Sequence, residues 1–177
     1  PDGVVWTTVN TQTIAMSSTS YQAGLYVCSF NTGALCTAVF DNVTVTNLSA
    51  GGTQGALAST NIGTTALAGS VNVNAGTYTV AGAGDNVEGT TDQGFFAYFP
   101  ISNAANCTIT ARVVSQTNTN ALATAGVMVR EGTANNVRRG YMAATPSSGF
   151  EFHYRTTAAA NDAKVTLVQP KPLWTRL

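Results

Sequence analysis

The residues that could hold a metal ion lie in one glycine-containing loop. Asp85, Glu88 and Asp92 form the acidic cluster of the sequence there. Carboxylate oxygens are the ligands that Ca²⁺ prefers in proteins, so a calcium site is one interpretation of this loop. The spacing matches no specific calcium-binding loop, and aspartate is common in turns because its side chain bonds nearby backbone groups. We therefore expect turn capping and no cofactor, with Ca²⁺ as the alternative.

The only histidine, His153, lies in a run that alternates like a strand. Because successive side chains of a strand point to opposite faces, Glu151 and Arg155 share its face. A nucleophilic enzyme would place a serine or cysteine motif beside such a base, and none accompanies His153. We expect a surface or interface histidine without a catalytic role.

Arg130 and Glu131 are a second pair whose types could act together. They are adjacent in the sequence, so on a strand they point to opposite faces and cannot form one catalytic pair. We expect Arg130 to be a structural ion-pair or hydrogen-bond donor. Glycoside hydrolysis needs two carboxylates at a defined separation, whereas the eight Asp and Glu of this chain are scattered. The sequence predicts no catalytic residues and no enzyme.

Charge is scarce and balanced throughout the sequence. Charged residues make up 9% of the chain, and eight Lys and Arg offset eight Asp and Glu. No long-range field is available to attract phosphates or anionic lipid, so we expect no nucleic-acid partner. No apolar run approaches the length of a membrane span, which excludes membrane insertion by a helix. With 44% hydrophobic residues, the chain should bury a core, and a neutral, hydroxyl-rich surface favours association.

The three cysteines bear on the compartment. A hairpin centred on Thr32 would place Cys28 directly opposite Cys36 on the neighbouring strand. Cysteines opposed in a non-hydrogen-bonded pair lie close enough to bond, so we expect a Cys28–Cys36 disulfide and an oxidising compartment. Two buried thiols without a disulfide are the alternative. Cys107 is expected to be a buried, inert thiol.

Three sequons for N-glycosylation begin at Asn42, Asn47 and Asn106. In a chain this rich in Asn and Thr, such triplets arise by chance. They would matter only in a source that glycosylates secreted proteins.

Short runs rich in β-branched and aromatic residues alternate with Gly, Asn and Asp turns along the sequence. No long stretch shows the apolar 3.6-residue period of a helix. The clearest hairpin joins Ala125–Glu131 to Arg139–Pro146 through a loop that contains Gly and Asn. Val127 and Met128 should point to opposite faces of this hairpin. We predict an all-β, antiparallel sandwich with this hairpin at its centre.

The glycine-rich segment 47–60 shows no periodic pattern and is the best linker candidate. It separates residues 1–46 from residues 61–177. We predict that these two regions are parts of β-sandwich modules, either one permuted domain or parts of two.

The motifs of the second region resemble those of a known family. The most specific are Ala125-Gly-Val-Met-Val-Arg-Glu131, Met142-Ala-x-Thr-Pro146 and Arg155-Thr-Thr157. They are similar to the N-terminal part of concanavalin A-like, jelly-roll β-sandwich modules, which often occur in tandem in large secreted or surface-attached bacterial proteins. Residues 1–46, with Asp2-Gly-x-x-Trp6-Thr7, resemble the C-terminal end of the same module. The resemblance implies a jelly-roll fold and an extracellular or cell-surface location.

The two parts occur in the reverse of the family's order. The chain could be cut from a tandem array in mid-module, or be a circular permutant in which residues 62–177 and 1–46 close one sandwich. The two halves could also belong to sandwiches completed by neighbouring chains. In that case open strand edges would template pairing, and a contact that does not close on itself would produce a filament.

Aromatic rings could stack on sugars, as in glycan-binding sandwiches. The candidates for such a platform are Tyr141, Phe150, Phe152 and Tyr154. The last three share one strand face and are better interpreted as core or interface. Trp6 and Trp174 match core positions of the family.

From these features we predict a non-catalytic extracellular β-sandwich that serves as a structural or adhesive subunit. It would assemble head-to-tail with copies of itself or neighbouring modules, into a surface array or filament, by edge-strand pairing and apolar packing. The expected contact edge comprises Val4, Val5, Trp6, Leu173, Trp174 and Leu177. The alternative is a carbohydrate-binding module of a secreted polysaccharide-acting protein. A sandwich glucanase is a weaker third option, because the Glu-x-Asp-x-x-Glu strand of those enzymes is absent.

Overall fold

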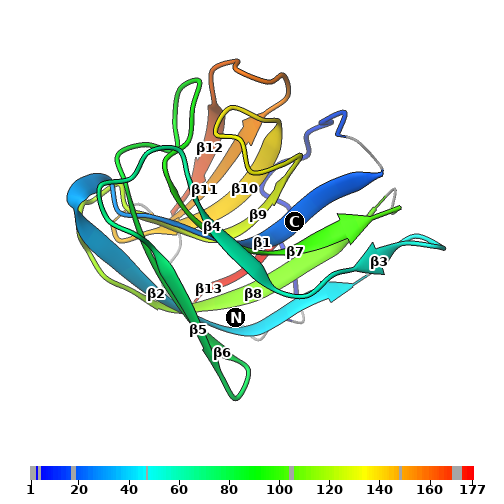
Figure 1. Cartoon of the computed structure of the whole chain (residues 1–177), viewed down its shortest axis with the longest axis horizontal. Helices are drawn as coiled ribbons and strands as arrows, with labels where there is room; N and C mark the ends of the chain where they lie inside the picture. The colour runs from blue at the N-terminus through cyan, green and yellow to red at the C-terminus, as the bar shows by residue number, and fades with distance from the viewer. Residues whose placement is uncertain are drawn as a thin grey trace.

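The computed structural model describes residues 3, 5–16, 19–46, 48–103, 106–147, 149–168 and 173–177. All regular structure in these residues is antiparallel β-strand, arranged in two sheets packed face to face (Figure 1). The described segments contain no helix, and so none that could cross a lipid bilayer. The predicted all-β antiparallel sandwich is confirmed.

Sheet A has eight strands in the order β12-β11-β10-β9-β1-β7-β3, and β4 also pairs with β7. Its strands are β1 (Ser20–Cys28), β3 (Thr53–Gln54), β4 (Ala58–Ile62), β7 (Gly94–Ser102), β9 (Thr124–Arg130), β10 (Arg139–Thr145), β11 (Gly149–Arg155) and β12 (Ala163–Leu167). Sheet B has five strands in the order β13-β8-β2-β6-β5. Its strands are β2 (Asn31–Thr46), β5 (Ser70–Asn74), β6 (Thr77–Gly84), β8 (Thr108–Gln116) and β13 (Leu173–Arg176).

The hairpin predicted at the centre of the fold is formed by β9 and β10, and this prediction is confirmed. Arg130 lies opposite Arg139, and Met128 lies opposite Tyr141. β9 lies between β10 and β1 in the middle of sheet A. Val127 packs into the core between the sheets, whereas Met128 packs on the other face of sheet A, as the alternation of strand side chains requires.

The hairpin predicted around Thr32 is wrong. β1 pairs with β7 and β9 in sheet A, whereas β2 pairs with β6 and β8 in sheet B. The chain passes from one sheet to the other at Phe30, which has a φ of 47°. Cys28 and Cys36 therefore do not face each other across a ladder, and the geometry behind the disulfide prediction does not exist. Both are buried thiols, and burial raises the pKa of Cys28 to about 12.

Strands from the first 46 residues lie between strands from the rest of the chain in both sheets. β1 is placed between β7 and β9, and β2 is placed between β6 and β8. The segment 47–60 contains β3 and the start of β4, and both pair with β7. Residues 53–54 and 58–60 of this segment are therefore paired into sheet A.

The main hydrophobic core lies between the two sheets. Among its fully buried members are Leu25, Val27, Phe40, Ile109 and Val127. Burial of each such side chain contributes about 1.5–3 kcal/mol relative to exposure. The core therefore holds the two sheets together and fixes the position of sheet A.

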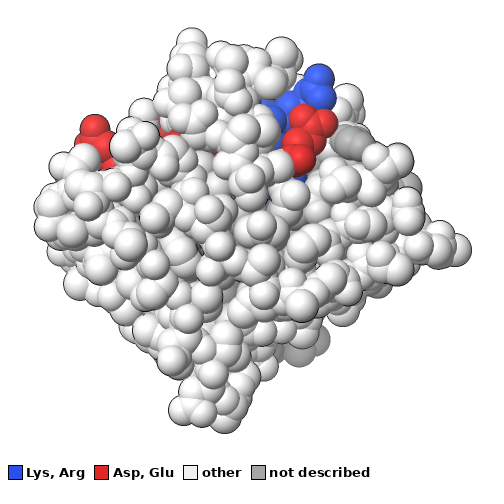
Figure 2. Space-filling view, viewed as in Figure 1, with Lys and Arg blue, Asp and Glu red and all other residues white. Residues whose placement is uncertain are grey.

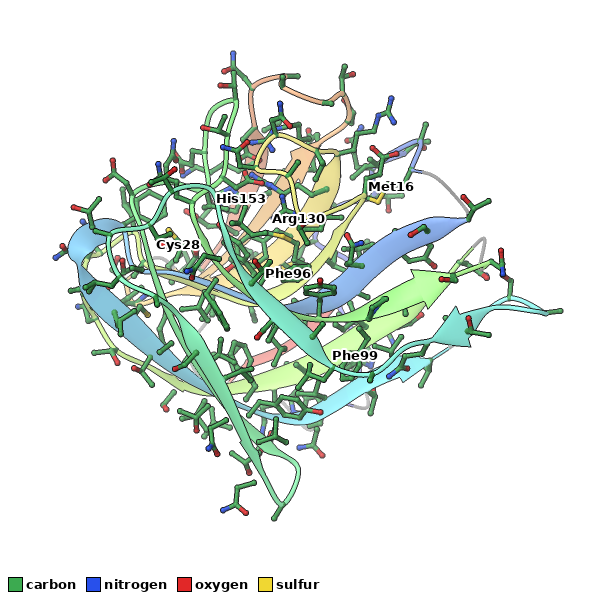
Figure 3. The ribbon with its side chains drawn as sticks, in the orientation of Figure 1. Met16, Cys28, Phe96, Phe99, Arg130 and His153 are labelled. Carbon is green, nitrogen blue, oxygen red and sulfur yellow. The ribbon has the colours of Figure 1, made fainter. Side chains whose placement is uncertain are left out.

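Sheet A is also buried on its other face, which we call the outer face. Tyr26, Phe96, Met128 and Tyr141 pack there, and the rings of Tyr26 and Tyr141 meet edge to face with centroids 5.2 Å apart. Arg130 and Phe96 lie on the same side of sheet A in Figure 3, beneath the loops at the top of the view. The buried charged side chains of sheet A also lie under these loops.

Candidate functional site: a buried ionic cluster on sheet A

Three arginines form a row across neighbouring strands on the outer face of sheet A. Arg130 on β9 lies opposite Arg139 on β10, which in turn lies opposite Arg155 on β11. All three side chains are fully buried. Like charges on neighbouring strands repel, so a buried row of this kind requires a counter-charge.

Asp92 supplies that counter-charge from the loop after β6, residues 85–93. Its Oδ1 accepts hydrogen bonds from Nε of Arg139 at 3.0 Å and Nη2 of Arg155 at 2.9 Å. Its Oδ2 lies 3.5 Å from Nη2 of Arg130. Burial raises the pKa of this carboxyl, but the three guanidinium groups outweigh burial and hold the pKa below its ordinary value. Asp92 is therefore ionised at neutral pH.

The arginines also attach the covering loops to the sheet. They donate hydrogen bonds to the backbone carbonyls of Val87, Gly89, Ala134, Val137 and Ala160. Two of the loops are joined directly, because the Asp162 N–H donates to the Gly89 carbonyl at 2.8 Å. Buried guanidinium donors need such partners. The loops after β6, β9 and β11 are thus held over the outer face.

His153 lies next to this row, between two carboxylates. Its Nδ1 is 2.7 Å from Oδ2 of Asp162, and its Nε2 is 3.0 Å from Oε2 of Glu151. Because a carboxylate can only accept, both ring nitrogens carry protons in this arrangement and the ring is an imidazolium. Burial lowers the pKa of His153, but Asp162 and Glu151 outweigh burial and raise it above its ordinary value.

The cluster reaches solvent at one end. Lys164 on β12 lies opposite His153 on β11, and its Nζ is 2.6 Å from Oε1 of Glu88 and 3.5 Å from Oε1 of Glu151. The side chains of Lys164 and Glu88 are 37% and 39% exposed, whereas that of Glu151 is 6% exposed. The polar network therefore runs from a buried interior to a surface ion pair.

This arrangement does not form a nucleophilic site. Both nitrogens of His153 are engaged by carboxylates, so neither can accept a proton from a hydroxyl or thiol. Asp92 is paired with three guanidinium groups, so its carboxylate is not available to act as a general base. The cluster can fix loops and hold charges, and at its open end it can present ligands to a cation.

The three carboxylates that the sequence placed in one loop do not share a site. Asp92 is buried within the arginine row, Glu88 pairs with Lys164, and Asp85 is exposed. The predicted calcium ligands are therefore not brought together. The spacing within the loop could not show this, because the arginines that draw Asp92 inward come from other strands.

Two further predictions concern residues of this cluster. His153 was expected at the surface or in an interface, and this is wrong because its side chain is fully buried within the chain. Arg130 was expected to be a structural donor, and its ion pair with Asp92 and its 2.6 Å hydrogen bond to the Ala134 carbonyl confirm this. The partner Asp162 was missed, since nothing near it in the sequence indicates that it meets His153.

The aromatic residues considered for glycan binding lie on different faces. Tyr141 is fully buried on the outer face of sheet A. Phe150 and Phe152 are also buried, on the opposite face, and Tyr154 stacks on Phe152 with ring centroids 5.5 Å apart. The shared face of the last three is as predicted. The four rings do not form one platform on which a sugar could stack.

The predicted assembly edge is partly within the described residues. Val4 and the side chain of Leu173 lie outside them. Val5 is 83% exposed, and Trp174 meets Trp6 edge to face with ring centroids 6.4 Å apart. The guanidinium carbon of Arg176 lies 4.1 Å from the centroid of Trp6. The edge strand β13 is therefore joined to Trp6 by aromatic contacts.

A groove of about 270 Å³ opens beside this edge, between β13 and sheet A. Its lining includes Val5, Trp6, Met142, Phe150, Leu167 and Trp174.

Of the possible glycosylation sites, Asn42 and Asn106 are exposed, and Asn47 lies outside the described residues. Cys107 is only half-buried, less than predicted, and burial raises its pKa.

No protein-family model, curated protein or solved structure matches this chain. Two features stand out in the described residues: the ionic cluster on sheet A and the edge of sheet B beside the groove.

Proposed function

We propose that this chain is a non-catalytic structural or adhesive subunit that joins copies of itself head-to-tail through the two edges of sheet B. Few charged residues appear on the face shown in Figure 2. This supports an assembly role, because a surface with little net charge favours association. The same neutral, hydroxyl-rich surface supports an extracellular or cell-surface location. The motifs of residues 62–177, together with the two packed sheets, support a jelly-roll, concanavalin A-like arrangement.

The observation that carries this proposal is the outward-facing backbone of β13. Leu177 exchanges both backbone hydrogen bonds with Ile109 of β8, at 2.9 and 3.0 Å. Because bonding groups alternate along an antiparallel strand, Thr175 also faces β8, whereas the N–H and C=O of Trp174 and Arg176 face away. In the part of the chain that the structure describes, no backbone hydrogen bond joins residues 5–9 to these groups.

The groove makes this edge suitable for an incoming strand. An extended chain that takes the place of residues 5–9 beside β13 would pair with the outward N–H and C=O groups and place alternate side chains over Met142, Phe150 and Leu167, which line the groove. Backbone pairing would supply direction, and apolar burial would contribute about 25 cal/mol per Å².

The opposite edge of sheet B is formed by β5, which pairs with β6 alone among the described strands. Its five residues include no charge and no proline, and its pairing with β6 shows no bulge. Natural sheets use those devices to prevent edge pairing. The β5–β6 hairpin projects from the body of the molecule in Figure 1. If β5 of one copy pairs with β13 of the next, two different edges meet, and such a contact propagates instead of closing.

A substitution at Arg176 tests this proposal. Arg176→Pro removes an outward N–H of β13 without removing a bond to β8, so it should abolish assembly. Arg176→Ala is the matched control, because it removes the side chain but keeps the N–H, and it should assemble. Light scattering over a range of concentrations and negative-stain microscopy would measure the difference.

Circular dichroism would establish that both variants keep their β-sheet content. A wild-type protein that stays monomeric at every concentration would refute assembly. Assembly of Arg176→Pro equal to that of wild type would show that β13 is not the contact.

A further inference from the structure

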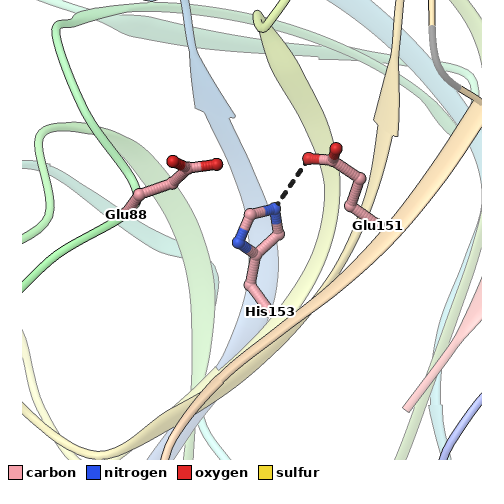
Figure 4. A group of neighbouring side chains, drawn as sticks. All are labelled: Glu88, Glu151 and His153. Carbon is pink, nitrogen blue, oxygen red and sulfur yellow. Dashed lines mark hydrogen bonds and ion pairs between the residues drawn. The ribbon is translucent and has the colours of Figure 1, made fainter. Parts of the chain in front are cut away.

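Three potential metal ligands converge where the ionic cluster reaches solvent (Figure 4). A ring nitrogen of His153 and carboxylate oxygens of Glu88 and Glu151 all lie within 4.8 Å of one another. Glu151 and His153 occupy same-face positions of β11, and Glu88 belongs to the loop after β6. The arginine cluster fixes that loop, since Arg139 and Arg155 bind the carbonyls of Val87 and Gly89. The ligands are therefore held by the fold from two sides.

The ring of His153 is oriented by a second carboxylate. Asp162 Oδ2 lies 2.7 Å from Nδ1, and Asp162 Oδ1 lies 2.9 Å from Nη2 of Arg139. Both His153 and Asp162 are buried. A carboxylate on the far nitrogen keeps a proton at Nδ1 and directs Nε2 toward the ligand group, which is how metal-binding histidines are commonly held.

The ammonium group of Lys164 occupies the position between the two glutamates that a metal ion would take. Its Nζ lies 2.6 Å from Glu88 and 3.5 Å from Glu151. Lys164 and Glu88 are more than a third exposed, so the ammonium group can turn into solvent without disturbing the buried ligands. The position is therefore one that a competing cation can reach.

We propose that Nε2 of His153 and the carboxylates of Glu151 and Glu88 bind a divalent transition-metal ion of the zinc class in place of the Lys164 ammonium group. A nitrogen ligand combined with carboxylates suits Zn²⁺, whereas Ca²⁺ takes oxygen ligands. On binding, the Nε2 proton leaves to solvent and the nitrogen lone pair coordinates the metal. One divalent ion then replaces one proton and one ammonium group, so the local charge is unchanged. This site is independent of the assembly proposed above.

Calorimetric titration of the untagged full chain with Zn²⁺ tests the site. Wild type should bind one Zn²⁺ per chain and should not bind Ca²⁺ there. Glu88→Gln removes a ligand at an exposed position and should weaken binding by about tenfold or more. Lys164→Ala removes the competing ammonium group and should strengthen binding. Asp41→Asn is the control, because it removes a carboxylate on sheet B, and it should bind like wild type.

The single histidine permits a second, direct readout. Nitrogen-15 NMR of the imidazole should show Nε2 shifting when Zn²⁺ is added and remaining unchanged with Ca²⁺. Absence of any zinc-dependent change at this ring would overturn the proposal. Zinc affinity that is equal in wild type, Glu88→Gln and Lys164→Ala would also overturn it, because the ion would then be bound elsewhere.

Discussion

Among the described residues, Asp92 has the most ion-pair partners in the ionic cluster. It forms ion pairs with Arg130, Arg139 and Arg155, and all four side chains are fully buried. Burying an ion costs several kcal/mol unless it is paired, so the loss of one partner leaves the others uncompensated. The pair between Asp41 and Arg112 is different, because its side chains are 23% and 36% exposed. Exposed pairs contribute at most about 1 kcal/mol.

We expect Asp92→Asn to reduce the free energy of unfolding by about 3–5 kcal/mol, because three buried guanidinium groups lose their counter-charge. Asp41→Asn should cost no more than about 1 kcal/mol. Urea denaturation at neutral pH would measure both changes. Equal effects of the two variants would contradict the role assigned to the buried cluster.

The contribution of Asp92 should also depend on pH. Its pKa is lowered in the folded protein, since the arginines outweigh the effect of burial. Because the pKa of Asp92 is lower in the folded than in the unfolded protein, the ionised carboxylate stabilises the fold. This contribution is complete above the unfolded-state pKa of about 3.9 and is lost as pH falls through the folded-state pKa. Urea curves should therefore show a constant gap between wild type and Asp92→Asn from neutral pH to about pH 5, narrowing below pH 4. Narrowing already near pH 6 would implicate another group.

Among the elements, β9 and β10 approach each other so closely that position 126 requires glycine. A Cβ on Gly126 would lie 1.9 Å from the Met142 carbonyl oxygen, well inside contact distance. Backbone atoms cannot move aside as a flexible side chain would. The pairing at the centre of sheet A therefore depends on the absence of this one methyl group.

We expect Gly126→Ala to destabilise the protein by about 3 kcal/mol, at the upper end of the usual cost of overpacking. Gly132→Ala is the matched control, because its nearest neighbour, a side-chain atom of Val137, lies 4.0 Å away. Thermal unfolding followed by circular dichroism would measure the two midpoints. A midpoint for Gly126→Ala equal to that of the control would show that the strands can separate without cost.

At the scale of the whole molecule, the two sheets differ in what they leave open. The strands β1, β9, β10 and β11 of sheet A are largely buried on both faces, whereas β2 of sheet B alternates buried and more exposed residues. The edges of sheet B carry little charge: β5 has none and β13 has only Arg176. Assembly through these edges should therefore change little between low and high salt, because screening acts on charges. Light scattering at both ionic strengths would extend the Arg176 test.

Local patterns predicted the central hairpin but not the neighbours of the first strand. Alternation and turn residues place β9 against β10, since both features lie within one short stretch. The same reasoning paired the strands around Thr32, because consecutive strands usually pair. Here Phe30 carries the chain into the other sheet. The misplaced Cys28–Cys36 contact follows from that single crossing.

The sequence by itself determined the all-β class and which strand residues share a face, because strand alternation is a property of neighbouring residues. Only the tertiary structure decided which charges meet. Asp92 accepts hydrogen bonds from Arg139 and Arg155, which lie 47 and 63 positions away in the sequence. Such pairs form when strands become neighbours in a sheet, and strand order depends on the packing of the whole chain. The ionic cluster, the convergence of Glu88, Glu151 and His153 at its exposed end and the groove beside β13 therefore emerge from the fold.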